Sequence, residues 1–128
     1  MEPIKIEKTF STPEVVFTPN NYTLMLEGRL IPENAETVFK PIIDWIDNYF
    51  KSGGETLKLL FRLYYYNTSS SKRIVNLMRK LDEYAANGKK ISIRWEYEEG
   101  DDDCMHDGND FAKMVKVIPV EVIEIEEI

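Results

Sequence analysis

The chain is poor in the two residue types that most often carry metal and redox chemistry. It has one cysteine, Cys104, and one histidine, His106, among 128 residues. A lone cysteine excludes an internal disulfide and a paired CxxC motif, which suits a reducing cytoplasm. Two positions apart on a helix, the two side chains would point to different sides. Both are interpreted as ordinary structural residues, and no metal site is expected.

Positive charge is also scarce. Lys and Arg number 16 against 23 Asp and Glu, which gives a formal net charge of −7 and a pI near 4.8. Nucleic acid is disfavoured as a partner because a phosphate backbone is held by clustered basic residues. No apolar run is long enough for a signal peptide or a membrane span. The composition predicts a soluble cytoplasmic protein without membrane insertion, whose partner has a basic or neutral surface.

What the sequence does contain is alternating strand and helix periodicity. Strand patterns are expected near 4–6, 12–17, 22–31, 57–66, 90–97 and 117–125, and helix patterns near 34–50, 74–85 and 110–116. Gly28 is interpreted as a bulge, and Pro41 as a kink or the start of a second helix. The strand at 57–66 is apolar on both sides, so we expect it to be central and covered on both faces.

This order predicts one α/β domain over residues 1–128. Tightly joined early strands form an N-terminal hairpin, and later strands alternate with crossover helices. The sheet is therefore expected to be mixed, with the last strand at an edge because of Pro119.

A hydroxyl cluster stands where the strand at 57–66 gives way to the second helix. Asn67 is followed by Thr68, Ser69, Ser70, Ser71 and Lys72. The first N–H groups of a helix have no internal partners and carry the positive end of its dipole, so an anion is stabilised there. Helix capping explains one of these residues but not four consecutive hydroxyls. A phosphate held as a ligand, or attached to a hydroxyl, is the alternative, with Lys72 and Arg73 as counter-charges.

Two phosphate chemistries differ in what they require. A nucleotide-binding P-loop needs glycines so that the backbone can wrap the phosphates, and none lies near Ser71 and Lys72. ATP hydrolysis is therefore disfavoured. A phosphoacceptor needs only an accessible hydroxyl, a kinase and surroundings that tolerate the added charge.

An acidic stretch runs from Glu96 to Asp110. Its spacing fails the calcium-loop template, so we interpret it as a solvated loop. Candidate contacts to a basic partner are Asp101, Asp102 and Asp103, together with Tyr64 and Tyr66.

Several short motifs resemble those of the SiaC-type regulatory phosphoproteins of bacteria, and the resemblance spans nearly the whole chain. The most specific run is 64–72. It is supported by 32–35, by Pro41 with Asp44 and Trp45, by Trp95 with Tyr97 ahead of Asp101 and Asp102, by Thr12 with Pro13, and by Gly108 with Phe111.

The resemblance implies a STAS-like fold and a switch that is not an enzyme and uses no cofactor. It implies that Thr68 is phosphorylated by a cognate kinase and dephosphorylated by a PP2C-like phosphatase. The unphosphorylated form would bind and activate an output partner such as a diguanylate cyclase, in cyclic-di-GMP signalling.

Two alternatives remain open. The helix entrance at 67–72 could bind the phosphate of a nucleotide or another ligand. The domain could instead be a structural subunit that uses Tyr64 and Tyr66 for a constitutive contact, whatever the state of Thr68.

Overall fold

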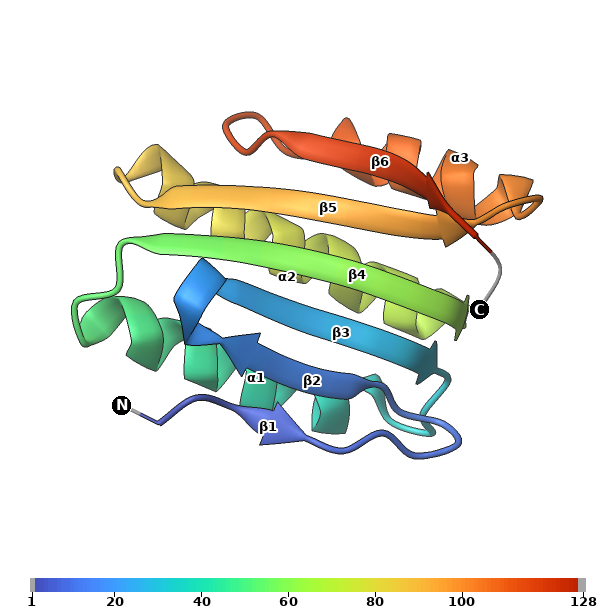
Figure 1. Ribbon diagram of the computed structural model, residues 1–128, viewed down its shortest axis with the longest axis horizontal. Coiled ribbons are helices and arrows are strands. Elements are labelled where there is room, and N and C mark those ends of the chain that lie inside the picture. The colour runs from blue at the N-terminus through green and yellow to red at the C-terminus, as the bar shows by residue number, and fades with distance from the viewer. Residues whose placement is uncertain (1, 127–128) are drawn as a thin grey trace.

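The structure is a computed structural model and describes residues 2–126. Its strands form a single sheet and its helices form a second layer (Figure 1). The elements, in chain order, are β1 (Lys5–Ile6), β2 (Glu14–Thr18), the short 3₁₀ turn η1 (Pro19–Asn21), β3 (Thr23–Leu30), α1 (Ala35–Lys51), β4 (Thr56–Tyr66), α2 (Thr68–Ala86), β5 (Lys90–Glu98), α3 (Asp102–Ala112) and β6 (Val120–Ile125).

The sheet is mixed, as predicted. Its strand order is β1-β2-β3-β4-β5-β6, with antiparallel pairing among the first three strands and parallel pairing from β3 to β6. The pairing register of β3 with β4 shifts between Gly28 and Arg29, so an irregularity lies where Gly28 predicted a bulge, with the extra residue, Tyr64, on β4. Because the last four strands are parallel, the helices that follow β3, β4 and β5 all begin on the same side of the sheet, where the carboxyl ends of these strands lie (Figure 1).

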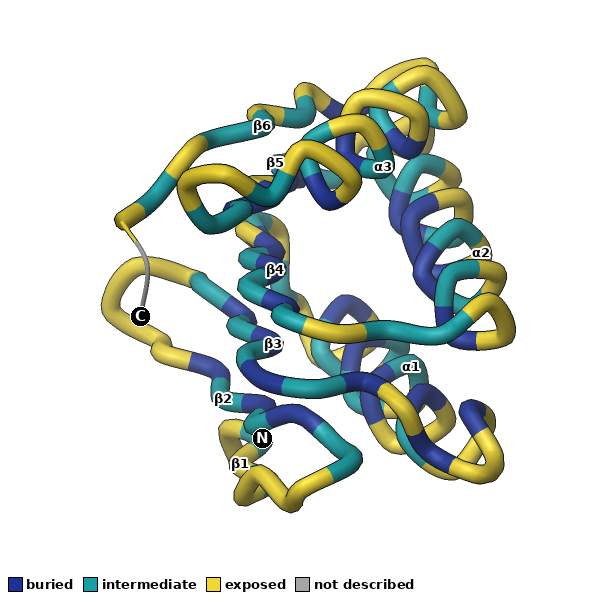
Figure 2. The backbone as a smooth tube through the Cα atoms, turned by 90° about the vertical axis from the view of Figure 1, so that its right-hand side faces the viewer, coloured by how far each residue is buried: buried dark blue, intermediate teal, exposed yellow. Residues whose placement is uncertain are grey.

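All three helices lie on the same face of the sheet, and the other face is uncovered (Figure 2). The prediction that β4 is covered on both faces was therefore wrong. Leu57, Leu59 and Phe61 point into the core, while Leu60 on the other face is only half-buried. The prediction counted Leu60 and Tyr64 as apolar residues that need a cover. On this face, however, the Tyr64 hydroxyl is hydrogen-bonded to the charged residue Glu27.

Ion pairs cross the uncovered face between β3, β4 and β5. Arg62 donates to Glu96 at 2.6 Å and to Glu27 at 3.0 Å, Arg94 donates to Glu96 at 2.8 Å, and the Tyr64 hydroxyl donates to Glu27 at 3.3 Å. Burial alone would raise the pKa of Glu96, but its hydrogen bonds from the two arginines hold that pKa below its ordinary value. Glu96 is thus a paired strand residue and takes no part in an acidic surface.

The first long helix is a single element that contains Pro41. The Asn34 side chain caps it by accepting a hydrogen bond from the N–H of Glu36 at 3.0 Å. Pro41 is exposed and neither ends the helix nor begins a second one. Of the two options left by the sequence, the start of a second helix at Pro41 was therefore wrong.

The third helix begins earlier than predicted. The prediction of a solvated loop followed by a helix at 110–116 was wrong, because α3 starts at Asp102 and ends at Ala112. Asp101 caps it by accepting the N–H of Cys104 at 3.1 Å, and acidic residues in the first turn favour the positive end of the helix dipole. Within residues 2–126 no helix is both long and apolar enough to cross a lipid bilayer.

Candidate functional site

The hydroxyl cluster forms the entrance of α2. Asn67 is the N-cap, and its side-chain oxygen accepts hydrogen bonds from the N–H of Ser70 at 2.9 Å and from the hydroxyl of Ser69 at 3.1 Å. The Ser71 hydroxyl donates to the backbone oxygen of Asn67 at 3.2 Å. The cap predicted from sequence is therefore present, and it engages two of the four hydroxyls.

The four hydroxyls differ in their exposure. Thr68 and Ser69 are exposed, Ser71 is half-buried, and Ser70 is fully buried with a hydroxyl that finds no hydrogen-bond partner among residues 2–126. A modifying enzyme needs an accessible hydroxyl, which removes Ser70 from consideration. Thr68, the first residue of α2, is the exposed hydroxyl that the cap does not use.

Thr68 lies at one end of an open groove of about 440 Å³ between α2 and α3. The groove is lined from α2 by Thr68, Lys72, Val75 and Arg79, and from the α3 side by Phe111 and Met114. The α2 residues recur at three and four along one helix face. Sequence reasoning missed this groove, because nothing in either helical pattern shows which two helices lie side by side.

Basic residues of α2 divide between its two sides. Lys72 and Arg79 line the groove with Thr68, whereas Arg73 lies with Glu36 and Lys40 in the space between α2 and α1. Of the two counter-charges proposed from sequence, only Lys72 therefore lies on the same side as Thr68. Lys72 is also four residues after Thr68, the separation at which charged helix side chains pair.

The first turn of α2 differs in charge from those of the other helices. Glu36 lies in the first turn of α1, and Asp102 and Asp103 lie in the first turn of α3, but the first turn of α2 has no acidic residue. The positive end of its dipole is therefore not offset by a carboxylate, and negative charge added at Thr68 would be stabilised there.

Tyr66, immediately before the cap, holds α3 beside this site. Its hydroxyl donates to Oδ2 of Asp107 at 2.6 Å, and its ring meets Trp95 edge-on, with centroids 5.7 Å apart. Burial, followed by the bond to Asp107, raises the pKa of Tyr66 far above its ordinary value, so the phenol remains a donor. Trp95 in turn donates to the backbone oxygen of Cys104 at 3.0 Å.

Tyr64 and Tyr66 do not form one contact surface. Tyr64 belongs to the ion-pair cluster on the uncovered face, whereas Tyr66 packs under α3. The exposed tyrosine of this run is Tyr65, with Arg29 over its ring at 5.9 Å. Arg29 also lies 4.6 Å from the ring centroid of Phe10, an exposed residue that sequence reasoning did not select.

The acidic candidates have different roles. Asp101 caps α3, while Asp102 and Asp103 are exposed in its first turn. This turn lies at the carboxyl ends of the parallel strands, where α2 also begins. Over residues 2–126 no group of three Asp, Glu, His or Cys side chains is arranged to hold a metal ion. Cys104 is buried, His106 is exposed, and burial raises the pKa of the Cys104 thiol to about 11, which makes it a poor nucleophile at neutral pH.

Fold and site together define a small α/β domain with an exposed threonine at a helix entrance and an open groove beside it. A family model described as SiaC family regulatory phosphoprotein matches residues 6–125. The chain belongs to this family. A protein of Pseudomonas aeruginosa strain UCBPP-PA14, named as uncharacterized, is 34% identical over 98 residues, or 77% of this chain and 78% of that protein.

Solved structures agree with this assignment. SiaC of Pseudomonas aeruginosa superposes with a TM-score of 0.86 at 28% identity, covering 98% of this chain and 100% of that one. A second match, with a TM-score of 0.87 and 28% identity over 95% and 99% of the two chains, comes from a crystal structure of the diguanylate cyclase SiaD in complex with its activator SiaC, from the same organism. The predicted family and fold class are confirmed.

Proposed function

We propose that this chain is a phosphorylation-gated protein-binding switch in which Thr68 accepts the phosphoryl group. The observation that supports it best is the position of Thr68, which is exposed at the first residue of α2 and at the end of the α2–α3 groove. A cognate kinase adds the phosphoryl group from ATP in the cytoplasm, and a PP2C-like phosphatase removes it. The domain itself catalyses nothing.

The groove is suited to an amphipathic helix of the partner. Half-buried Val75 and exposed Met114 supply apolar surface above the buried Phe111, and Lys72 and Arg79 supply positive charge on the α2 side. From Thr68 to Arg79 the rise of α2 is roughly 16 Å, which matches about three turns of a second helix. A partner helix with one apolar and one acidic face would fit this surface, because the groove is locally basic although the net charge of the chain had favoured a basic or neutral partner. Membership in a family with an activator of a diguanylate cyclase makes such a cyclase the proposed output partner.

Phosphorylation would change this surface by charge. A phosphothreonine carries roughly −1.5 to −2 charges, is favoured at a helix N-terminus, and can pair with Lys72 four residues later. The same charge at the end of the groove repels an acidic helix and would cost several kcal/mol if buried unpaired. The unphosphorylated form is therefore the one that binds.

The alternative is a phosphate ligand bound by the backbone N–H groups at the start of α2. Two of these N–H groups already donate hydrogen bonds within the protein. The N–H of Ser70 already bonds to the Asn67 side chain, and the N–H of Ser71 bonds to the Asn67 backbone oxygen at 3.0 Å. A ligand phosphate would find fewer of the N–H groups that usually cradle it. This favours covalent attachment at Thr68 over ligand binding.

The test uses the full chain, its kinase and ATP, with the modified residue mapped by mass spectrometry. We expect one phosphate, on Thr68, in the wild type and in Ser69→Ala, and none in Thr68→Val. Ser69→Ala is the matched control, since Ser69 is the adjacent exposed hydroxyl. Phosphate on another residue, or unchanged modification of Thr68→Val, would reject the assignment.

Gating is tested by calorimetry of the cyclase with the unphosphorylated protein, the phosphorylated protein and Thr68→Asp. We expect loss of binding on phosphorylation and a smaller loss for Thr68→Asp, because a carboxylate carries less charge than a phosphate. Equal affinities for all three would rule out gating. Tight binding of ATP, GTP or cyclic-di-GMP by the domain alone would instead support the ligand-binding alternative.

A further inference from the structure

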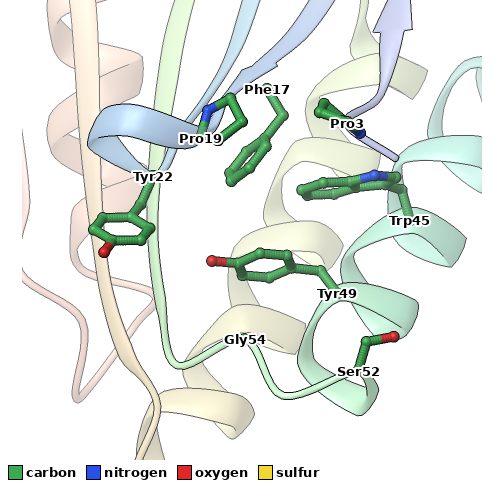
Figure 3. Close-up of a pocket in the computed structure, with 8 residues that line it drawn as sticks. All are labelled: Pro3, Phe17, Pro19, Tyr22, Trp45, Tyr49, Ser52 and Gly54. Atoms are coloured by element: carbon green, nitrogen blue, oxygen red, sulfur yellow. The ribbon is translucent and has the colours of Figure 1, made fainter. Parts of the chain in front are cut away.

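A cavity of about 300 Å³ opens at the far end of β4 from Thr68 (Figure 3). Gly54 lines it just before β4 begins, whereas Thr68 follows the last residue of that strand. Four aromatic rings and two prolines form most of the wall: Pro3, Phe17, Pro19, Tyr22, Trp45 and Tyr49. The function proposed above does not use this cavity.

Three of the rings form a packed aromatic wall. Trp45 and Tyr49 are nearly parallel, at 14° with centroids 5.1 Å apart, and Phe17 is inclined at 47° to Trp45 with centroids 4.7 Å apart. The polar tips of two rings are bonded within the protein. Trp45 Nε1 donates to the backbone oxygen of Glu2 at 3.1 Å, and the Tyr49 hydroxyl donates to that of Thr56 at 2.7 Å. These two residues therefore have no free N–H or O–H left to donate to a ligand; they offer ring surface and the Tyr49 oxygen, which can still accept a hydrogen bond.

The fourth ring is held by an uncommon backbone. Tyr22 has a φ of 57°, in the left-handed region that glycine and asparagine adopt at lower cost. The Tyr22 side chain is 48% exposed, so burial does not explain its presence there. Backbone bonds from Tyr22 N–H to Pro19 and from Lys58 N–H to Tyr22 hold the turn that carries this ring beside the cavity (Figure 3). A bulky residue in this conformation points to a use for its ring.

The electrostatics of the cavity favour a cation. Ring faces are the negative part of an aromatic quadrupole. Within residues 2–126 no Lys or Arg lines the wall, although Lys89 Nζ donates to the backbone oxygen of the lining residue Gly54 at 2.9 Å. Ser52, the C-cap of α1, also lines the cavity, so the negative end of the α1 dipole lies beside it. Lys51 in the last turn of α1 is exposed and lies outside the lining.

We propose that this cavity binds a methylated ammonium group. An unmodified ammonium is strongly hydrated, whereas a methylated one sheds water easily and gains cation–π attraction from several rings at once. A volume of about 300 Å³ suits such a small head group. The group can belong to a small molecule such as choline or to a trimethylated lysine side chain, and the chemistry of recognition is the same.

The test compares choline with 3,3-dimethylbutan-1-ol, its uncharged isostere, by calorimetry on the full chain. N-acetyl-trimethyllysine amide and its unmethylated counterpart form the second pair. We expect at least one methylated cation to bind about fivefold or more tightly than its paired compound. Binding should also change the fluorescence of Trp45, and Trp45→Phe, which keeps the fully buried Trp95, should remove that change. Equal affinities within both pairs, or no saturable binding, would overturn the proposal.

Variants of Tyr22 separate ligand binding from folding. Tyr22→Gly removes the ring and suits the left-handed backbone, so its unfolding midpoint should not fall, while affinity for the cation should drop about fivefold. Tyr22→Phe retains the ring and should retain the affinity. Unchanged cation binding by Tyr22→Gly would contradict the role assigned to this ring. If Tyr22→Gly is not folded, Tyr22→Asn gives the same comparison.

Discussion

The Tyr66 hydroxyl lies 2.6 Å from Oδ2 of Asp107 and donates a hydrogen bond to it, which joins the last residue of β4 to the middle of α3. Thr68 is two residues beyond Tyr66, and Phe111 is one helical turn beyond Asp107 on the same side of α3. One hydrogen bond therefore ties α3, which forms one wall of the groove, to the end of the strand that leads into α2, the other wall.

We expect Tyr66→Phe to loosen this connection. The half-buried Asp107 would lose its donor, so the free energy of unfolding should fall by about 1–3 kcal/mol. Affinity for the partner helix should fall as well, because α3 would no longer be fixed beside α2. Urea denaturation and calorimetry measure the two effects. The control is the Tyr65→Phe protein, changed at an exposed neighbour, and its free energy of unfolding should stay within about 0.5 kcal/mol of the wild type. A Tyr66→Phe protein as stable as this control would contradict the role of the bond.

A second prediction compares two arginines of α2. Arg79 lines the groove and Arg73 lies on the side of α1, so Arg79→Ala should weaken partner binding by about 1 kcal/mol while Arg73→Ala should leave it nearly unchanged. The affinity of the wild type should also fall more steeply with salt than that of Arg79→Ala. Calorimetry at two salt concentrations tests both statements. Equal losses for the two variants would mean that the partner does not use the groove.

Asp82 provides a prediction about pH. Its carboxylate accepts hydrogen bonds from the N–H groups of Lys116, Val117 and Ile118 at 2.9, 2.8 and 3.1 Å, and so holds the chain between α3 and β6. Desolvation raises the pKa of Asp82, but these backbone bonds outweigh it and lower the pKa below its ordinary value of 3.8. The stabilisation is complete above that ordinary value and is lost as the pH falls through the lowered one.

We therefore expect Asp82→Asn to lose about 1–3 kcal/mol of unfolding free energy at neutral pH. The difference between wild type and variant should shrink as the pH falls from about 5 toward 2. Urea denaturation across this range measures it, and Glu83→Ala, an exposed neighbour, is the control. A difference that stays constant with pH would show that the carboxylate charge is not what stabilises this connection.

The order of elements could be predicted because each signal is local. Period-two and period-3.6 patterns located β3, α1, β4 and β5, and Gly28 marked the position of the register shift. The start of α3 was missed because carboxylates were counted as a solvated run. The position of these carboxylates, and not their number, indicates a helix start. Asp101 is the N-cap, and the next two residues place negative charge at the positive end of the helix dipole.

The site was only partly predictable for a related reason. The Asn67 cap and the hydroxyl cluster at the helix entrance could be found because they follow from neighbours in sequence, whereas Thr68 was singled out only by the resemblance to SiaC-type proteins. The groove could not, since it depends on α2 and α3 lying together through Tyr66 and Trp95. The separation of Arg73 from Lys72 follows from the same pairing of helices. The kinase, the phosphatase and the likeness to STAS domains stay predictions.

The ion pairs on the uncovered face also have a consequence for how the sheet assembles. Arg62 pairs with Glu27 on one neighbouring strand and with Glu96 on the other. Side chains alternate between faces, so a slip of β4 by one position would turn its arginine toward the helices and expose leucines to water. These charges therefore exclude mispaired alignments of the central strand during folding, a selective effect that is separate from whatever they add to the stability of the finished sheet.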